Sequence, residues 1–223
     1  MTENKVHITK LAAAERQLRA AIRMFFDEED DLAIHTVASA AYKVLADLKA
    51  DRGMDEVADW HLTSFFYVIR DYRRGTLPDH LTQNNDFMSW VADIANQLPI
   101  TGETKLEDVS VTVSRRAVID YWNEKNKTAN FLKHADRDPR AALPLDEIDN
   151  QTLLIQAYCA YRDLTPDELG NEGLVFRIFI GARSPEAEDS NSGYKDLVLK
   201  ISEVPEPKRK HLCGFVVREL NAA

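Results

Sequence analysis

The chain has 223 residues, a net charge of −9, and 44% hydrophobic and 29% charged residues. This composition supports a packed core and excludes a disordered chain, and no apolar run is long enough to span a membrane. The pI near 5.2 excludes a general nucleic-acid-binding surface, so contact with nucleic acid has to be confined to a local patch. The N-terminus does not resemble a signal peptide, and the two cysteines lack metal-ligand spacing. We therefore expect a cytoplasmic protein with free thiols and no membrane partner.

The composition favours helix throughout, with only eight glycines and eight prolines. Apolar residues recur at helical spacing along most of the chain, which predicts an all-α bundle of about eight helices. The periodic segments cover approximately residues 9–26, 32–49, 55–72, 85–97, 114–140, 147–161, 165–179, 194–201 and 208–220.

The first two helices are expected to form an antiparallel pair. Residues 9–26 carry one apolar stripe, whereas residues 32–49 are apolar on nearly all sides, which is typical of a central helix. Ala38 and Ala41 are predicted at the closest approach of the pair. We interpret His35, near the start of the second helix, as a hydrogen-bonded core or capping residue rather than a site residue.

The later segments contain two further signals. The alternating stretch at residues 106–113 is interpreted as an extended lead-in to the next helix. The sequence from Thr165 to Glu168 has a Thr cap, a proline at the first helical position and a glutamate at the third, which predicts a helix start. Residues 1–140 are expected to form a bundle with the candidate site at its C-terminal end. Residues 141–223 are expected to pack on it as part of one continuous domain.

The candidate site lies in the segment Ser114–Arg140, which contains seven basic and four acidic residues and so has a charge of +3. On a helix, Asn126, Asn130 and His134 would share one edge, because they are four residues apart. Lys127 and Phe131 would lie beside that edge, away from the apolar stripe. This arrangement suits a flat or anionic ligand; alternatively, Phe131 packs on a neighbouring helix or a second subunit.

The sequence lacks the common signatures of metal, cofactor and phosphate sites. It contains no glycine-rich phosphate loop, nucleophile elbow, HExxH or CxxC. His134, Asp136 and Asp138 could act as metal ligands only if the helix ended there, because side chains two residues apart diverge on a helix. We expect ion pairing for both aspartates, and neither a metal nor a cofactor.

A small-residue helix pair followed by a helix with the pattern Asn130-x-x-x-His134 resembles the HEPN (higher eukaryotes and prokaryotes nucleotide-binding) helical superfamily. Nuclease members of that superfamily carry an arginine, usually followed by a polar residue, and then a histidine. Asn130 and His134 match the last two elements, whereas Ala129 stands where the arginine is expected. The resemblance covers roughly residues 8–140.

The resemblance implies a helical homodimer and metal-independent RNA cleavage, with His134 and Asn130 as the catalytic pair. Lys127 or Arg137 would have to replace the missing arginine. Our leading hypothesis is a module that binds RNA, a nucleotide or a partner protein in a stress or defence system, with Lys127, Asn126, Phe131 and Arg137 as ligand-binding residues. The alternatives are a ribonuclease that uses His134, a protein-interaction scaffold built on the apolar N-terminal helix pair, and a structural role in which Asn130 and His134 position the following loop.

Overall fold

The computed structural model describes residues 7–54, 56–109, 123, 126–134, 136–183, 185 and 193–222. The chain divides into two compact units. The first contains the residues up to Met54 and those from Glu124 onward, and the second contains Asp55–Asn123. The sequence-based division at residue 140 did not anticipate that a middle segment forms the smaller unit. The part of the chain that the structure describes is helical and contains no β-strand, which confirms the all-α prediction.

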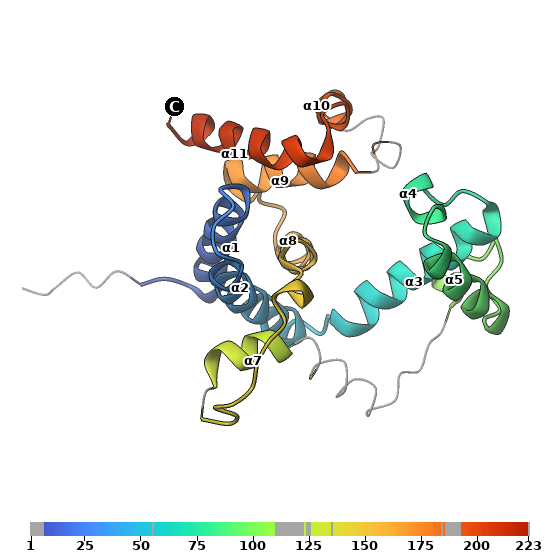
Figure 1. Ribbon diagram of the computed structural model, residues 1–223, viewed down its shortest axis with the longest axis horizontal. Coiled ribbons are helices and arrows are strands. Elements are labelled where there is room, and N and C mark those ends of the chain that lie inside the picture. Colours follow the sequence, from blue (N-terminus) through green and yellow to red (C-terminus); the bar gives the residue numbers. More distant parts are fainter. Residues whose placement is uncertain are drawn as a thin grey trace, which may run out of the picture. The chain divides into compact units, whose positions relative to one another are not determined.

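The first unit contains seven α-helices among its described residues (Figure 1). They are α1 (Lys10–Phe26), α2 (Asp31–Asp51), α7 (Lys127–Lys133), α8 (Asn150–Leu164), α9 (Gly170–Gly181), α10 (Lys195–Ser202) and α11 (Glu206–Ala222), with a short 3-10 helix at Leu145–Glu147.

Helices α1 and α2 form the expected antiparallel pair. Side-chain oxygens cap both helices: Thr9 accepts from the backbone N–H of Ala12, and Asp30 accepts from the first turn of α2. Ala38 and Ala41 are fully buried. Because alanine side chains are small, they allow the close approach of neighbouring helices that a central helix requires.

Helix α8 packs on both α1 and α2, and α9 packs on α1 and α11 (Figure 1). At the end of α1, Phe25 and Phe26 meet Phe176 and Phe179 of α9, mostly edge to face, with ring centroids 5.4 to 6.3 Å apart. Such contacts combine apolar burial with favourable ring electrostatics. This aromatic cluster joins the N-terminal pair to the C-terminal helices.

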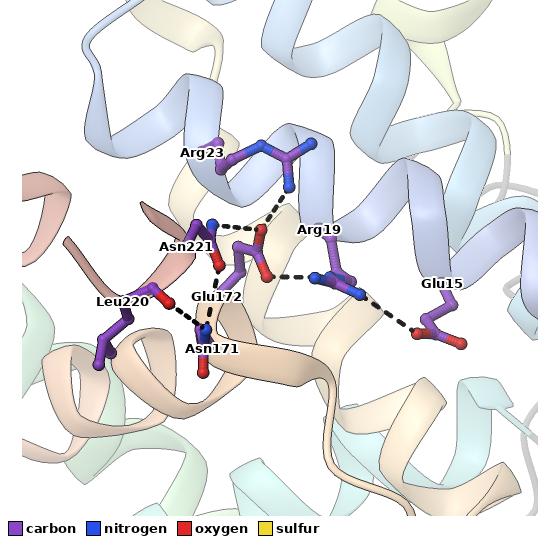
Figure 2. A network of polar contacts seen from close by, with 7 residues as sticks. All are labelled: Glu15, Arg19, Arg23, Asn171, Glu172, Leu220 and Asn221. Atoms are coloured by element: carbon purple, nitrogen blue, oxygen red, sulfur yellow. Dashed lines mark hydrogen bonds and ion pairs between the residues drawn. The ribbon is translucent and has the colours of Figure 1, made fainter. Parts of the chain in front are cut away.

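A buried carboxylate of α9 makes polar contacts with α1 and α11 (Figure 2). Glu172 of α9 is 0% exposed and accepts hydrogen bonds from Arg19 Nε (2.9 Å), from Arg23 and from Asn221 Nδ2 (3.0 Å). Burial raises the pKa of Glu172, but these hydrogen bonds and one from its own backbone outweigh burial and lower the pKa below its usual value. The Glu172 network, defined as Glu172 with Arg19, Arg23 and Asn221, therefore ties α1, α9 and α11 together.

Two glycines allow the close packing around the Glu172 network. Gly170 has a φ of +66°, and a side chain there would lie 2.9 Å from the guanidinium carbon of Arg19. Gly214 of α11 lies so close to α1 that an added Cβ would be 2.9 Å from the carbonyl oxygen of Phe26. Position 170 favours glycine because of its left-handed backbone, whereas position 214 favours it because the backbone of Phe26 occupies the space of a side chain.

The second unit contains α3 (Glu56–Arg74), α4 (Asp79–Thr82) and α5 (Asn85–Gln97), followed by a 3-10 helix at Leu106–Asp108. Helix α5 has the predicted bounds, and Asn84 caps it through Phe87 N. The apolar cluster of this unit consists of Phe66, Ile69, Ala95 and Ile100. Arg73 donates to the carbonyl oxygen of Ala95 (2.7 Å) and so joins α3 to α5.

Two predicted helices differ from the observed ones. The helix start predicted at Thr165 is wrong, because α9 begins at Gly170. The Thr165 hydroxyl accepts from the nearby Asp167 N, Glu168 pairs with Arg162, and the buried Leu169 precedes the left-handed Gly170. Within the segment predicted as helix at residues 114–140, α7 covers only Lys127–Lys133, and residues 114–122 lie outside the described residues. None of the described helices is both long and apolar enough to cross a membrane.

Candidate functional site

The predicted site residues lie on and around α7. Asn126 is the N-cap and His134 is the C-cap of this helix, so only the central residues have regular helical geometry. Backbone hydrogen bonds link Asn126, Asn130 and His134 one helical turn apart: Asn130 N–H donates to Asn126 O (2.7 Å), and His134 N–H donates to Asn130 O (3.0 Å). The three residues follow one another along α7 and its two caps.

The side chains around α7 are solvent-accessible. Phe131 is 37% exposed, and Asn130 and Arg137 are exposed. The His134 ring is partly exposed, with Nδ1 3.9 Å from the Asp136 carboxylate. Lys127 pairs with Glu147 at 3.2 Å, and both side chains are about half exposed. The α7 edge therefore presents polar and aromatic groups to solvent, but its Lys127 already has an acidic neighbour.

The HEPN resemblance expects an arginine at position 129, and this position is buried. Ala129 is 6% exposed and is the buried residue of this helix, which packs on α2. An arginine there would have to enter a packed helix contact and could not reach a phosphate beside the exposed His134. A cation for RNA cleavage would therefore have to come from another position, such as Arg137, which follows the end of α7.

A pocket of about 410 Å³ opens between α2, α7 and the start of α8. Its volume is within the usual range of small-molecule sites, roughly 300–1,000 Å³. Asp149 forms part of its wall and also caps α8 by accepting from Thr152 N (2.9 Å). The lining residues come from distant parts of the sequence: His35, Lys127, Thr128, Glu147, Asp149, Thr152, Leu153 and Gln156. We call this the His35 pocket.

Two buried polar side chains lack complete hydrogen bonding: His35, which lines the pocket, and Asn150 at the start of α8, which does not. Neither ring nitrogen of His35 has a hydrogen-bond partner, although the residue is only 8% exposed. Asn150, which is 4% exposed, donates from Nδ2 to the backbone and side-chain oxygens of Asp31 at 3.0 Å, and its Oδ1 makes no hydrogen bond of regular geometry. Buried polar groups are normally paired, so these atoms identify an unusual part of the molecule.

Burial lowers the pKa of His35 below its usual value of 6.5 and so favours the neutral imidazole. A side-chain hydrogen bond with Asn150, too distorted in geometry to be assigned as a regular bond, partly opposes this shift, and the charge of Lys133 adds to it. A neutral imidazole has one N–H donor and one nitrogen acceptor. Asn150 Oδ1 could accept from only one of the two nitrogens after a small side-chain movement, so at least one nitrogen would remain unpaired.

Other kinds of chemistry have little support in the described residues. Within the described ranges, no three or more His, Cys, Asp or Glu side chains are grouped so that they could hold a metal ion. The thiol of Cys213 is buried, which raises its pKa to about 11, so it is a poor nucleophile. The expected absence of a metal or cofactor stays a prediction.

The sequence interpretation missed most of the His35 pocket. His35 is buried as expected; its ring nitrogens make no hydrogen bond of regular geometry, although hydrogen bonding with the Asn150 side chain contributes to its pKa. A neutral polar residue within an apolar helix was a signal for His35, whereas Asn150, Thr152 and Gln156 resemble ordinary helix-start and surface residues. Comparisons with protein-family models, with curated proteins and with solved structures found no match for this chain.

Proposed function

We propose that this chain binds a nucleotide or a short single-stranded RNA at the His35 pocket and the adjoining α7 surface. The observation that carries the proposal is the pair of unpartnered nitrogens of His35 beside a polar pocket of 410 Å³. A ligand that supplies the missing hydrogen bonds would offset the free-energy penalty of burying these groups. Such an arrangement favours ligand binding over a purely structural role.

The α7 segment supports the phosphate-binding part of the proposal. Residues 126–140 carry four basic side chains and two aspartates, a net charge of +2 in a chain of charge −9. Phe131 is exposed beside them and offers a ring on which a base can stack. The scaffold alternative places the interface on the apolar N-terminal helix pair, but apolar residues of these helices such as Leu18, Ile22 and Leu45 are buried within the chain itself.

Titration calorimetry with 5′-nucleotides and a short unstructured RNA tests this function. We expect Lys133→Ala to weaken binding. The slope of log K against log salt concentration should also become smaller by about 1, which corresponds to the loss of one phosphate contact. The matched control is Lys208→Ala, an exposed lysine on α11, which should leave both values unchanged. Absence of binding to every nucleotide and RNA tested would contradict the proposal.

The ribonuclease alternative and the HEPN-like relationship can be tested with the same material. Cleavage of the RNA by the wild type and its loss in His134→Ala, with binding retained, would favour the nuclease. Binding without cleavage by the wild type favours the binding module.

The proposal includes a homodimer. Exposed apolar side chains on the two C-terminal helices support it: Leu197, Leu199, Phe215 and Leu220 are 42 to 51% exposed. Sedimentation equilibrium tests this part, and a single species with the mass of one chain would contradict it.

A further inference from the structure

Helix α11 has one side that packs on the rest of the chain and an opposite side that faces solvent. Its buried residues lie on the side that contacts α1 and α9. The opposite side carries a row of residues spaced 4, 3, 4 and 3 positions apart: Lys208, Leu212, Phe215, Glu219 and Ala222. This spacing is the one through which paired helices contact each other along a straight line. We call this row the α11 seam.

The middle of the α11 seam is apolar, and the residues on either side of the middle carry opposite charges. Phe215 is 51% exposed, and Leu212 is half-buried one turn before it. Lys208 lies near the start of α11 and Glu219 near its end, and both are exposed. An exposed aromatic residue between unlike charges fits a partner that has the same pattern in reverse order.

A second copy of α11 that runs in the opposite direction has this reversed pattern. In a two-fold symmetric contact, residue i meets residue j of the partner, and residue j meets residue i. With the axis midway between Leu212 and Phe215, each Leu212 packs on the partner's Phe215. The same axis also lies midway between Lys208 and Glu219, so each Lys208 meets the partner's Glu219. Two apolar contacts and two ion pairs therefore form in one register.

We infer that the α11 seam is the homodimer contact, and that two copies of the chain pair through it as antiparallel helices. This inference rests on the proposed function, which includes a homodimer, and it names the surface and its geometry. A parallel pair would place Lys208 beside Lys208 and Glu219 beside Glu219, and such like-charge contacts are unfavourable. Antiparallel pairing also brings Lys208 toward the C-terminal end of the other helix, where the helix dipole is negative.

Carbodiimide cross-linking of the full chain tests the geometry, because this reagent joins a lysine amine to a carboxylate only when the two groups touch. Within one chain, Lys208 and Glu219 are 11 residues apart, roughly 16 Å along a helix, so they cannot be joined there. We expect a cross-linked dimer whose digest contains the peptide that joins Lys208 to Glu219. Glu219→Gln should lose this joined peptide.

Sedimentation equilibrium measures how much the seam residues contribute to the dimer. Lys208→Glu and Glu219→Lys should each weaken the dimer about tenfold, because each places two pairs of like charges in contact. The double variant should restore the wild-type affinity. Phe215→Asp should give the mass of one chain. Leu145→Asp, the same change at an apolar residue of 65% exposure, is the matched control and should leave the dimer unchanged.

Two results would overturn this inference and leave the homodimer standing: a dimer without the cross-link between Lys208 and Glu219, or a double variant that does not restore affinity. The mass of one chain at every concentration would overturn both the inference and the homodimer. Nucleotide binding is measured separately by calorimetry, so failure of that part of the proposed function is distinguishable from failure of the α11 contact.

Discussion

Two regions in which the described residues bury polar side chains differ in how completely those groups are paired. In the Glu172 network, each carboxylate oxygen accepts from an arginine, and one also accepts from Asn221 (Figure 2). Around His35, the ring nitrogens and Asn150 Oδ1 make no hydrogen bond of regular geometry. A paired buried network specifies how helices pack, whereas an incompletely paired one beside a cavity can be completed by a ligand. The contrast separates a structural site from a binding site within one fold.

The largest expected effect is the loss of the Glu172 carboxylate. Glu172→Ala should lower the free energy of unfolding by about 3 kcal/mol, because two arginines lose their buried partner. The effect is at the lower end of the usual range since Arg19 and Arg23 are about one-third to two-fifths exposed and can be solvated. Urea unfolding at pH 7 measures it.

The control for this experiment is Glu168→Ala, which removes a partly exposed carboxylate paired with Arg162. It should change the free energy of unfolding by less than about 1 kcal/mol. Equal effects at Glu168 and Glu172 would show that the buried network does not stabilise the fold more than a surface pair does.

The second prediction tests the close approach of α11 to α1, which places Asn221 beside Glu172. Gly214→Ala should destabilise the chain by about 1–3 kcal/mol, because the added methyl group would overlap the carbonyl oxygen of Phe26. Gly193→Ala is the matched control, since a Cβ there meets nothing within 4 Å. Thermal melts of both variants measure the difference. A Gly214→Ala variant as stable as Gly193→Ala would contradict the packing of α11 on α1.

The third prediction concerns His35, where we expect no loss in the free energy of unfolding, in contrast to the two variants above. His35→Leu should keep the free energy of unfolding within about 1 kcal/mol of the wild type or increase it, because it removes buried polar atoms that have no partner. Urea unfolding without ligand measures this. A loss of more than about 2 kcal/mol would indicate that His35 makes a stabilising hydrogen bond in the folded chain, and the contrast between the two sites would then disappear.

The smallest expected effects are those of pH. The lowered pKa of His35 means that the unfolded chain binds a proton more readily, so stability should decrease as pH falls below 6.5. Glu172 also has a lowered pKa, and its contribution is present above the unfolded value of 4.5 and is lost as pH falls through the folded value. The wild type should therefore lose stability in two pH ranges, one below pH 6.5 and one below pH 4.5.

Two variants show which residue is responsible for the loss of stability in each pH range. The free energy of unfolding of His35→Leu, measured between pH 7 and pH 5, should show a smaller slope than the wild type. Glu172→Ala should keep the wild-type slope in that range and lose the part below pH 4.5. Identical slopes in the wild type and both variants would show that neither His35 nor Glu172 causes the pH dependence of stability.

The helices were largely predictable because their signals are local. The periodic apolar residues of α1, α2 and α5, together with the caps Thr9, Asp30 and Asn84, determine where those helices lie. The start of α9 was not predictable in this way. A local capping pattern at Thr165 was overridden by burial of Leu169 and by the left-handed Gly170, which depend on contacts with distant residues.

The sequence by itself determined the helical class, the N-terminal pair and the exposed polar character of α7, since each follows from residues within a few turns of one another. Only the tertiary structure decided that Ala129 faces α2 and that Lys127 pairs with Glu147. It also placed Asn150 against Asp31, 119 residues earlier, and brought His35 together with Lys127 and Gln156 in one pocket. The physical reason is that hydrogen-bond satisfaction depends on which distant groups meet in space, and spacing along the chain does not specify those meetings.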